Sequence, residues 1–168
     1  MTAVLRNVAA RWRAFAGEAD AVRDASVGIA NAIRAVRIAD AGPMTALPRM
    51  ARPVEGCITS RFAMRDGRLH EGIDIAQREG TPVHAALAGV AVLVGELPGY
   101  GRVVVVDHAG DLATVYAHLS RADVAAGEHV DPERPLGAVG TTGRTFGPHL
   151  HFEVRFDGTA VDPLVFLD

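Results

Sequence analysis

The sequence predicts a mainly β protein: an antiparallel sandwich or barrel-like domain preceded by an α-helical N-terminal segment. From Gly56 onward, short runs of β-favouring residues alternate with glycine, proline and aspartate turns. Pairs such as Asp157-Gly158 are typical of tight hairpin turns. Before Gly56 the pattern differs, because large apolar residues recur at helical spacing. A chain of 168 residues fits one such domain plus an appendage.

The N-terminal part is expected to be helical over residues 2–39, where one apolar stripe recurs every three or four positions. Gly42-Pro43 ends this helix, and the proline-containing stretch that follows has no clear periodicity. The predicted organisation is a helical segment at 1–42, a linker at 43–55 and a β domain at 56–168. The apolar stripe indicates that the helix packs on the domain, on a second copy or on another protein.

The β domain is expected to contain short strands bounded by turn residues. Polar and apolar residues alternate strictly in the last strand. This places the apolar residues from Leu150 to Phe156 on the core face and the polar ones from His149 to Arg155 on the other. The predicted strands are Cys57–Phe62, Ile73–Ala76, Pro82–Ala86, Val90–Leu97, Arg102–Asp107, Leu112–His118 and His149–Phe156.

The composition excludes several functions. A net charge of −3 without a long Lys/Arg run argues against a nucleic-acid partner, and the lack of a GKS or GKT sequence excludes a P-loop. The single cysteine, Cys57, cannot form an internal disulfide and is expected to be a small buried residue. The first forty residues lack the apolar run of a secretion signal, and no segment is long enough to span a bilayer. The chain as given is therefore expected to be soluble and without an export signal.

All seven histidines lie between positions 70 and 151. His149 and His151 begin the last predicted strand and share one of its faces. Two positions along a strand span roughly 6.6 Å, so one imidazole can bind a metal while the other reaches the metal-bound water. Two surface histidines on a polar strand face would give the same pattern, so this motif alone leaves both interpretations open.

The segment from His70 to Asp74 pairs a histidine with a carboxylate, a combination that suits zinc. Gly72 and the β-branched residues after it argue against a helix. In a straight strand His70 and Asp74 would lie roughly 13 Å apart, too far to share one ion easily. A shared ion therefore requires a bend near Glu71-Gly72, which glycine permits at little cost.

A third pattern, Tyr116-Ala117-His118-Leu119, closes another strand, and strand alternation places Tyr116 and His118 on one face. The remaining histidines are expected to play no part in the chemistry, with His84 in a strand, His108 in a hairpin turn and His129 in a polar loop. Together the three motifs offer two histidine ligands, one carboxylate ligand and two further histidines. A zinc site with three protein ligands keeps a fourth position for water, which is the catalytic arrangement. The two further histidines can then move protons or stabilise an oxyanion.

In this order and spacing, the motifs resemble those of the lysostaphin-like (LytM-type) zinc metalloendopeptidases. The resemblance covers about residues 55–166. The motifs that carry it are His70-x-x-x-Asp74, Tyr116-Ala117-His118-Leu119 and Gly147-Pro148-His149-Leu150-His151-Phe152-Glu153-Val154, supported by Gly80-Thr81-Pro82-Val83, Gly140-Thr141-Thr142-Gly143-Arg144 and Val161-Asp162-Pro163-Leu164.

The resemblance implies an antiparallel β fold of the duplicated hybrid motif type, with a groove over the sheet. It implies Zn²⁺ held by His70, Asp74 and His151. It implies that His149 is the general base and that His118 stabilises the tetrahedral intermediate or handles its protons. The implied substrate is the stem peptides or cross-links of bacterial peptidoglycan, which lies in the cell envelope or outside the cell. The resemblance does not decide which bond is cleaved, and both glycyl-glycine bridges and D-Ala–diaminopimelate links stay open.

Two positions depart from the family pattern. Phe146 replaces a small hydroxyl residue before Gly147-Pro148, and Ala63 replaces a glycine after Phe62. Neither change removes a ligand, so both bear on groove shape and substrate preference. The alternative function is a non-catalytic cell-wall-binding or hydrolase-activating module of the same fold, which the N-terminal helix would suit. A sugar-transport phosphocarrier is a third interpretation, for which the element from His70 to Asp74 would be superfluous.

Overall fold

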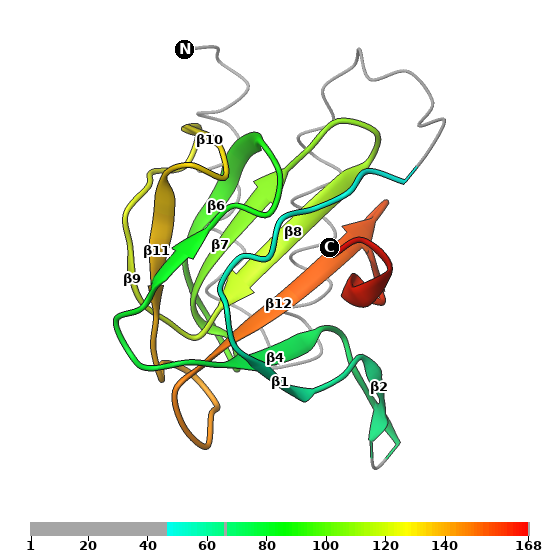
Figure 1. The fold of residues 1–168 in the computed structure, drawn as a ribbon, viewed down its shortest axis with the longest axis vertical. Helices are drawn as coiled ribbons and strands as arrows, with labels where there is room; N and C mark the ends of the chain where they lie inside the picture. Colours follow the sequence, from blue (N-terminus) through cyan, green and yellow to red (C-terminus); the bar gives the residue numbers. More distant parts are fainter. Residues whose placement is uncertain (1–46, 66, 168) are drawn as a thin grey trace.

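The computed structural model describes residues 47–65 and 67–167. The predicted N-terminal helix at 2–39 lies outside these residues. Of the predicted linker, residues 47–55 are described, and they run along the β domain in front of β8 and β12 (Figure 1). Met50 and Val54 are buried in the core, and the Met50 amide donates to the carbonyl of Phe166. Among the described residues, no helix is long and apolar enough to cross a membrane.

The domain is built on one antiparallel eight-stranded sheet, which confirms the predicted mainly β fold (Figure 1). Strands β1, β4, β12, β8, β7, β6 and β10 follow one another across it, and β13 pairs with the later part of β12. Their bounds are β1 Cys57–Ser60, β4 Ile73–Ala76, β6 Gly89–Leu97, β7 Gly101–Asp107, β8 Leu112–Ala117, β10 His129–Val130, β12 His149–Phe156 and β13 Thr159–Val161.

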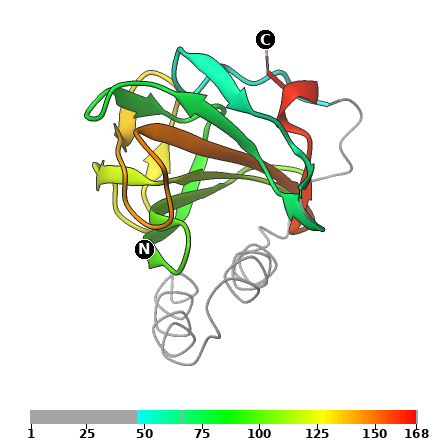
Figure 2. The same cartoon turned by 90° about the horizontal axis from the view of Figure 1, so that it is seen from below.

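Two smaller sheets complete the domain. The three-stranded sheet orders β5, β11 and β9, and the two-stranded sheet pairs β2 with β3 as a hairpin beside β4 (Figure 2). Their bounds are β2 Ala63–Arg65, β3 Arg68–His70, β5 Pro82–His84, β9 Leu119–Ala122 and β11 Pro135–Val139, and a short 3₁₀ helix, η1, spans Pro163–Val165.

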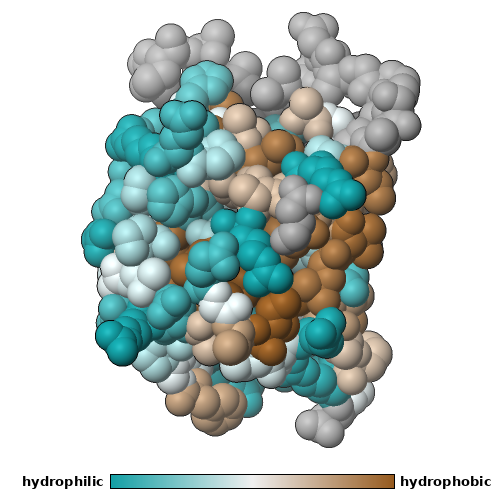
Figure 3. All heavy atoms as spheres, in the orientation of Figure 1, coloured by the Kyte–Doolittle hydropathy of each residue, from teal (hydrophilic) through white to brown (hydrophobic). Residues whose placement is uncertain are grey.

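The core lies mainly on one face of the large sheet. Leu150, Phe152 and Val154 of β12 are fully buried there, and the Tyr116 ring packs 5.4 Å from that of Phe152. In the space-filling view, hydrophilic side chains cover the side of β9 and β11, whereas hydrophobic ones gather over β12 and η1 (Figure 3). Burial of these large apolar side chains is the main force that fixes the sheet on which the site is built.

The predicted strands are present, with corrections. The expected strand Cys57–Phe62 ends at Ser60, and Cys57 is exposed instead of buried. Phe156 was expected in the core but is 44% exposed, because β12 ends there at the edge of the sheet. His129 lies in the two-residue strand β10 and not in a loop. Strands β2, β3, β9, β10, β11 and β13 were missed, and each of them has two to five residues.

Candidate metal centre

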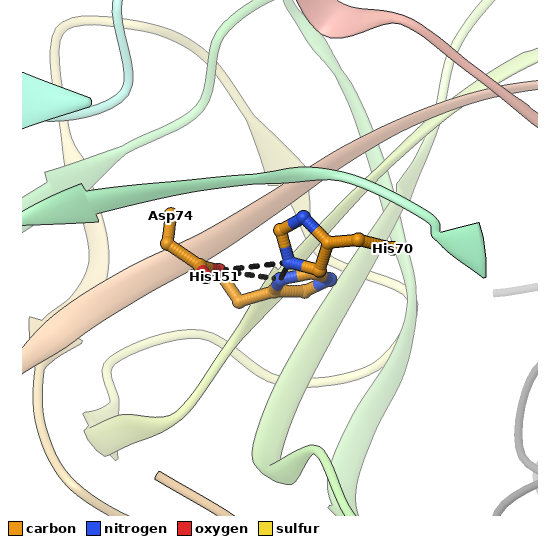
Figure 4. A group of neighbouring side chains, drawn as sticks. All are labelled: His70, Asp74 and His151. Carbon is orange, nitrogen blue, oxygen red and sulfur yellow. Dashed lines mark hydrogen bonds and ion pairs between the residues drawn. The ribbon is translucent and has the colours of Figure 1, made fainter. Parts of the chain in front are cut away.

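Three predicted ligands meet at one point of the fold. His70 ends β3, Asp74 lies in β4, and His151 lies in β12 directly opposite Asp74 in the strand pairing. His70 Nε2 is 3.2 Å from Asp74 Oδ1, and His151 Nδ1 is 2.8 Å from the same oxygen (Figure 4). The two ring nitrogens lie 3.2 Å apart. One ligand atom from each residue therefore points into a single small volume.

The bend predicted at Glu71-Gly72 is present and brings His70 back to Asp74. Strand β3 ends at His70, and β4 begins at Ile73. A Cβ atom on Gly72 would lie 2.3 Å from the carbonyl oxygen of Phe152. Only glycine therefore lets this turn lie against β12. The close approach brings His70 and Asp74 next to His151, so the three predicted ligands can meet.

Substitution of Gly72 by alanine is expected to disturb this site. The new Cβ would push the turn away from β12, because the atom that it meets belongs to the backbone. We expect zinc affinity to fall at least roughly tenfold and the free energy of unfolding to fall by about 1–3 kcal/mol. Zinc titration and chemical denaturation measure the two quantities. Gly95→Ala is the matched control, since nothing lies within 4 Å of a Cβ there, and equal effects of both substitutions would contradict this reasoning.

The two further histidines flank the ligands. The rings of His118 and His149 lie 4.8 Å apart, and His118 lies 5.8 Å from His151. His149 Nδ1 is 2.8 Å from the carbonyl oxygen of Gly147, and His118 Nδ1 is 2.8 Å from that of Thr142. A carbonyl can only accept, so each Nδ1 carries the proton. In the neutral state each Nε2 is then a free base.

The position of His118 differs from the prediction. Tyr116 and His118 were expected on one face of a regular strand, but this is wrong. Tyr116 pairs with Phe152 on the core side, whereas Ala117 pairs with His151. Strand β8 ends at Ala117, and His118 has a φ of 60°, in the left-handed region. This conformation turns the His118 side chain to the face that carries His149 and His151, and it is costly for a residue other than glycine.

The acid–base state of the site follows from burial and hydrogen bonding. Burial acts to raise the pKa of Asp74, but the bonds from His151 and His70 outweigh it and hold that pKa well below its usual range. Burial acts to lower the pKa of His151, but its bonds to Asp74 and Glu153 outweigh burial and raise it to about 9. Burial lowers the pKa of His118 to about 4, so this ring is neutral at pH 7.

The ligand set suits a zinc ion. The three ligand atoms lie within 4.8 Å of one another, and two imidazole nitrogens with one carboxylate oxygen are typical of catalytic zinc sites. His70 Nδ1 lies 2.9 Å from the carbonyl oxygen of Arg61, and its Nε2 faces Asp74 and His151. The donor atoms of His70, Asp74 and His151 therefore fit a Zn²⁺ cofactor.

Zinc affinity is expected to rise with pH. With a pKa of about 9, His151 of the metal-free protein is protonated at neutral pH, and a metal must displace that proton. Apparent affinity should then increase roughly tenfold per pH unit between pH 6 and 8 and level off above about pH 9. Competition against a chelating dye at each pH measures it, and a flat profile from pH 6 to 8 would contradict the protonated state of His151.

Behind the ligands lies a buried polar group that we did not assign from the sequence. Glu153 and Arg155 are 0% and 1% exposed, and they contact Tyr100 and Glu71. Burial acts to raise the pKa of Glu153, but the charge of Arg155 and the bond from His151 outweigh it and lower it to about 2. Strand alternation had placed Glu153 and Arg155 on the same face of the strand as His151. That placement was the sequence pattern that could have linked them to the site.

The remaining histidines lie outside this centre. His108 is buried, and its two ring nitrogens contact the carbonyl of Ala88 and the hydroxyl of Thr114. His84 Nδ1 contacts the carbonyl of Pro132. That neither residue takes part in the chemistry stays a prediction.

Comparison with known proteins identifies relatives of the β domain. The model of peptidase family M23 matches residues 68–163. The DD-carboxypeptidase/endopeptidase Mpg of Neisseria meningitidis is 47% identical over 97 residues, which are 58% of this chain and 22% of that protein. Stage II sporulation protein Q of Bacillus subtilis is 40% identical over 104 residues, which are 60% of this chain and 37% of that protein. The chain thus spans less than half the length of these curated relatives.

Solved structures agree with this relationship. A zinc-containing peptidase from Vibrio cholerae has a TM-score of 0.63 and 36% identity, covering 66% of this chain and 37% of that one. The catalytic domain of the antimicrobial peptidase lysostaphin from Staphylococcus simulans has a TM-score of 0.58 and 31% identity. That match covers 66% of this chain and 89% of the lysostaphin domain. The similarity therefore extends over nearly the whole of a catalytic domain.

Proposed function

Because the chain belongs to peptidase family M23, we propose that it is a zinc metalloendopeptidase that hydrolyses peptide bonds in bacterial peptidoglycan. The observation that carries this proposal is the convergence of five side chains. Three of them, His70, Asp74 and His151, offer ligand atoms to one ion. The other two, His118 and His149, lie beside these residues, with each Nδ1 bonded to a backbone carbonyl.

His149 and His118 have different roles in the proposed hydrolysis. When bound, Zn²⁺ lowers the pKa of a coordinated water toward ~7 and polarises the substrate carbonyl. His149 holds its Nδ1 proton on the Gly147 carbonyl, so its Nε2 can accept the proton of the attacking water. His118 starts neutral and can take up a proton at Nε2, after which it can donate to the oxyanion or to the leaving amine. The Thr142 carbonyl keeps His118 in that tautomer.

The substrate class rests on the family. The resemblance of the motifs to lysostaphin-like enzymes implies peptide stems or cross-bridges of peptidoglycan. Phe146 is fully exposed three residues before His149, and Ala63 is exposed on β2 and pairs with His70. Ala63 therefore lies beside a proposed ligand and Phe146 near the proposed base in sequence, so both can affect which peptide is accepted. Two relatives are named lipoproteins, which supports a location in the cell envelope.

Hydrolysis of purified peptidoglycan tests this function. Zinc-loaded protein is incubated with purified cell walls, and the released fragments are identified by mass spectrometry. We expect soluble peptides with new amino termini, no release after chelation, and recovery when zinc is restored. Zinc-loaded protein that releases nothing from walls of either cross-link chemistry would count against the enzyme.

The alternative is a non-catalytic module that binds the wall or another protein. One comparison favours this alternative. A crystal structure of a complex of SpoIIIAH and SpoIIQ contains a chain that is 32% identical to this one, with a TM-score of 0.64. This alternative predicts that the biological effect survives replacement of His149. Replacement of His149 therefore distinguishes the two functions, because only the enzyme should lose its effect.

A further inference from the structure

The carboxylate of Glu153 is held in one position by three donors. Its Oε1 accepts from His151 Nε2 at 3.0 Å and from the Tyr100 hydroxyl at 2.7 Å. Its Oε2 accepts from Arg155 Nε at 2.6 Å. Glu153 is 0% exposed, so water does not compete for these bonds. The His151 ring thus has one nitrogen on Asp74 and the other on Glu153.

Arg155 connects Glu153 to the turn between β3 and β4. Its guanidinium donates to Glu71 Oε2 at 2.7 Å and to the carbonyl of Gly158 at 3.1 Å. Glu71 directly follows His70 in the turn between β3 and β4. One buried cation therefore joins the strand of one proposed ligand to the turn of another.

We propose that Glu153 and Arg155 are positioning residues of the metal centre. Glu153 fixes the His151 tautomer and ring orientation, and Arg155 holds Glu153 while fastening the β3–β4 turn to β12. This inference rests on the proposed function, because it assigns these residues through His151 and His70. Neither residue offers a ligand atom to the ion itself.

The chemistry favours this assignment over a purely structural ion pair. A histidine that binds a metal through one nitrogen usually donates its other N–H to a carboxylate or carbonyl, which raises ligand basicity and fixes the ring. The His151 Nε2 contact to Glu153 has this form. A buried pair between Glu153 and Arg155 alone would contribute little net stability. Their connection to both ligand segments explains why these charges are retained inside the domain.

Glu153→Gln tests the proposal with little change of shape. The amide has one oxygen in place of two, so its NH₂ group must face a donor, either Arg155 Nε or the pair on Oε1. We expect the Kd for zinc to rise roughly 10- to 100-fold. The proton on His151 Nε2 in the zinc-loaded protein should move upfield in the NMR spectrum, because a charge-assisted bond is lost. Glu96→Gln is the control, since its carboxylate forms an exposed pair with Arg102.

The outcomes distinguish failure of the positioning role from failure of the proposed zinc-dependent function. Unchanged zinc affinity and an unchanged His151 signal in folded Glu153→Gln protein would overturn the positioning role, even if its melting temperature falls. If this variant does not fold, Tyr100→Phe decides, because it removes one donor from Glu153 and should weaken zinc binding roughly fivefold. Unchanged affinity there would overturn the proposal. Failure of the unmodified protein to bind zinc would instead reject the proposed function.

Discussion

Replacement of His151 by alanine is expected to abolish both zinc binding and peptidoglycan hydrolysis. His151 Nδ1 lies 2.8 Å from Asp74 Oδ1 and 3.2 Å from His70 Nε2, so its removal takes one of three ligand atoms from the centre. Loss of the metal removes several kcal/mol of transition-state stabilisation, which corresponds to a decrease of roughly a thousandfold or more in rate. Metal analysis after dialysis and release of wall peptides measure the two effects.

The matched control for this substitution is His129→Ala. His129 is an exposed histidine in the short strand β10, so the control removes the same ring from a different part of the domain. It should leave both zinc content and hydrolysis unchanged. His151→Ala protein that stays folded and still holds a full complement of zinc would show that the ligand set is wrong.

Replacement of His149 by alanine is expected to have a different result. His149 Nε2 lies 3.7 Å from Asp74 Oδ1, farther than the ring nitrogens of His70 and His151. We therefore expect zinc content to stay the same and hydrolysis to fall by roughly 10²- to 10⁴-fold, the usual contribution of a general base. The two measurements must be made on the same preparation.

This comparison also tests the division of roles between the two histidines of β12. Loss of zinc in His149→Ala together with retained zinc in His151→Ala would show that the ligand and the base are exchanged. Equal loss of zinc in both variants would show that the two rings act together as ligands. Retained hydrolysis in His149→Ala would instead favour the non-catalytic alternative or another base.

Much of the site could be predicted from local patterns. Strand periodicity placed His149 and His151 on one face, and the distance argument required the bend that Gly72 provides. The conformation of His118 could not be predicted, because strand alternation gives no sign that β8 ends at Ala117 with a left-handed residue after it. Its side chain is turned toward the site by tertiary contacts such as the bond to Thr142.

The polar residues behind the ligands show where such patterns are insufficient. Alternation assigned Glu153 and Arg155 to the polar face of β12, which is usually a solvated face in antiparallel sheets. The structure buries both, because Tyr100 from the β6–β7 turn and Glu71 from the β3–β4 turn pack over them. Those contacts join segments far apart in the sequence, so they depend on the folded topology. The two-residue strand β10 was missed for the same reason, since its pairing with the distant strand β6 defines it.

Titration of zinc into the metal-free chain, with the rate of peptidoglycan hydrolysis recorded at each step, tests the central claim most directly. We predict that the rate rises in proportion to added zinc and stops rising at about one ion per chain, as expected for a single catalytic site. A rate that does not depend on zinc, or no hydrolysis when the site is fully occupied, would contradict a zinc-dependent endopeptidase.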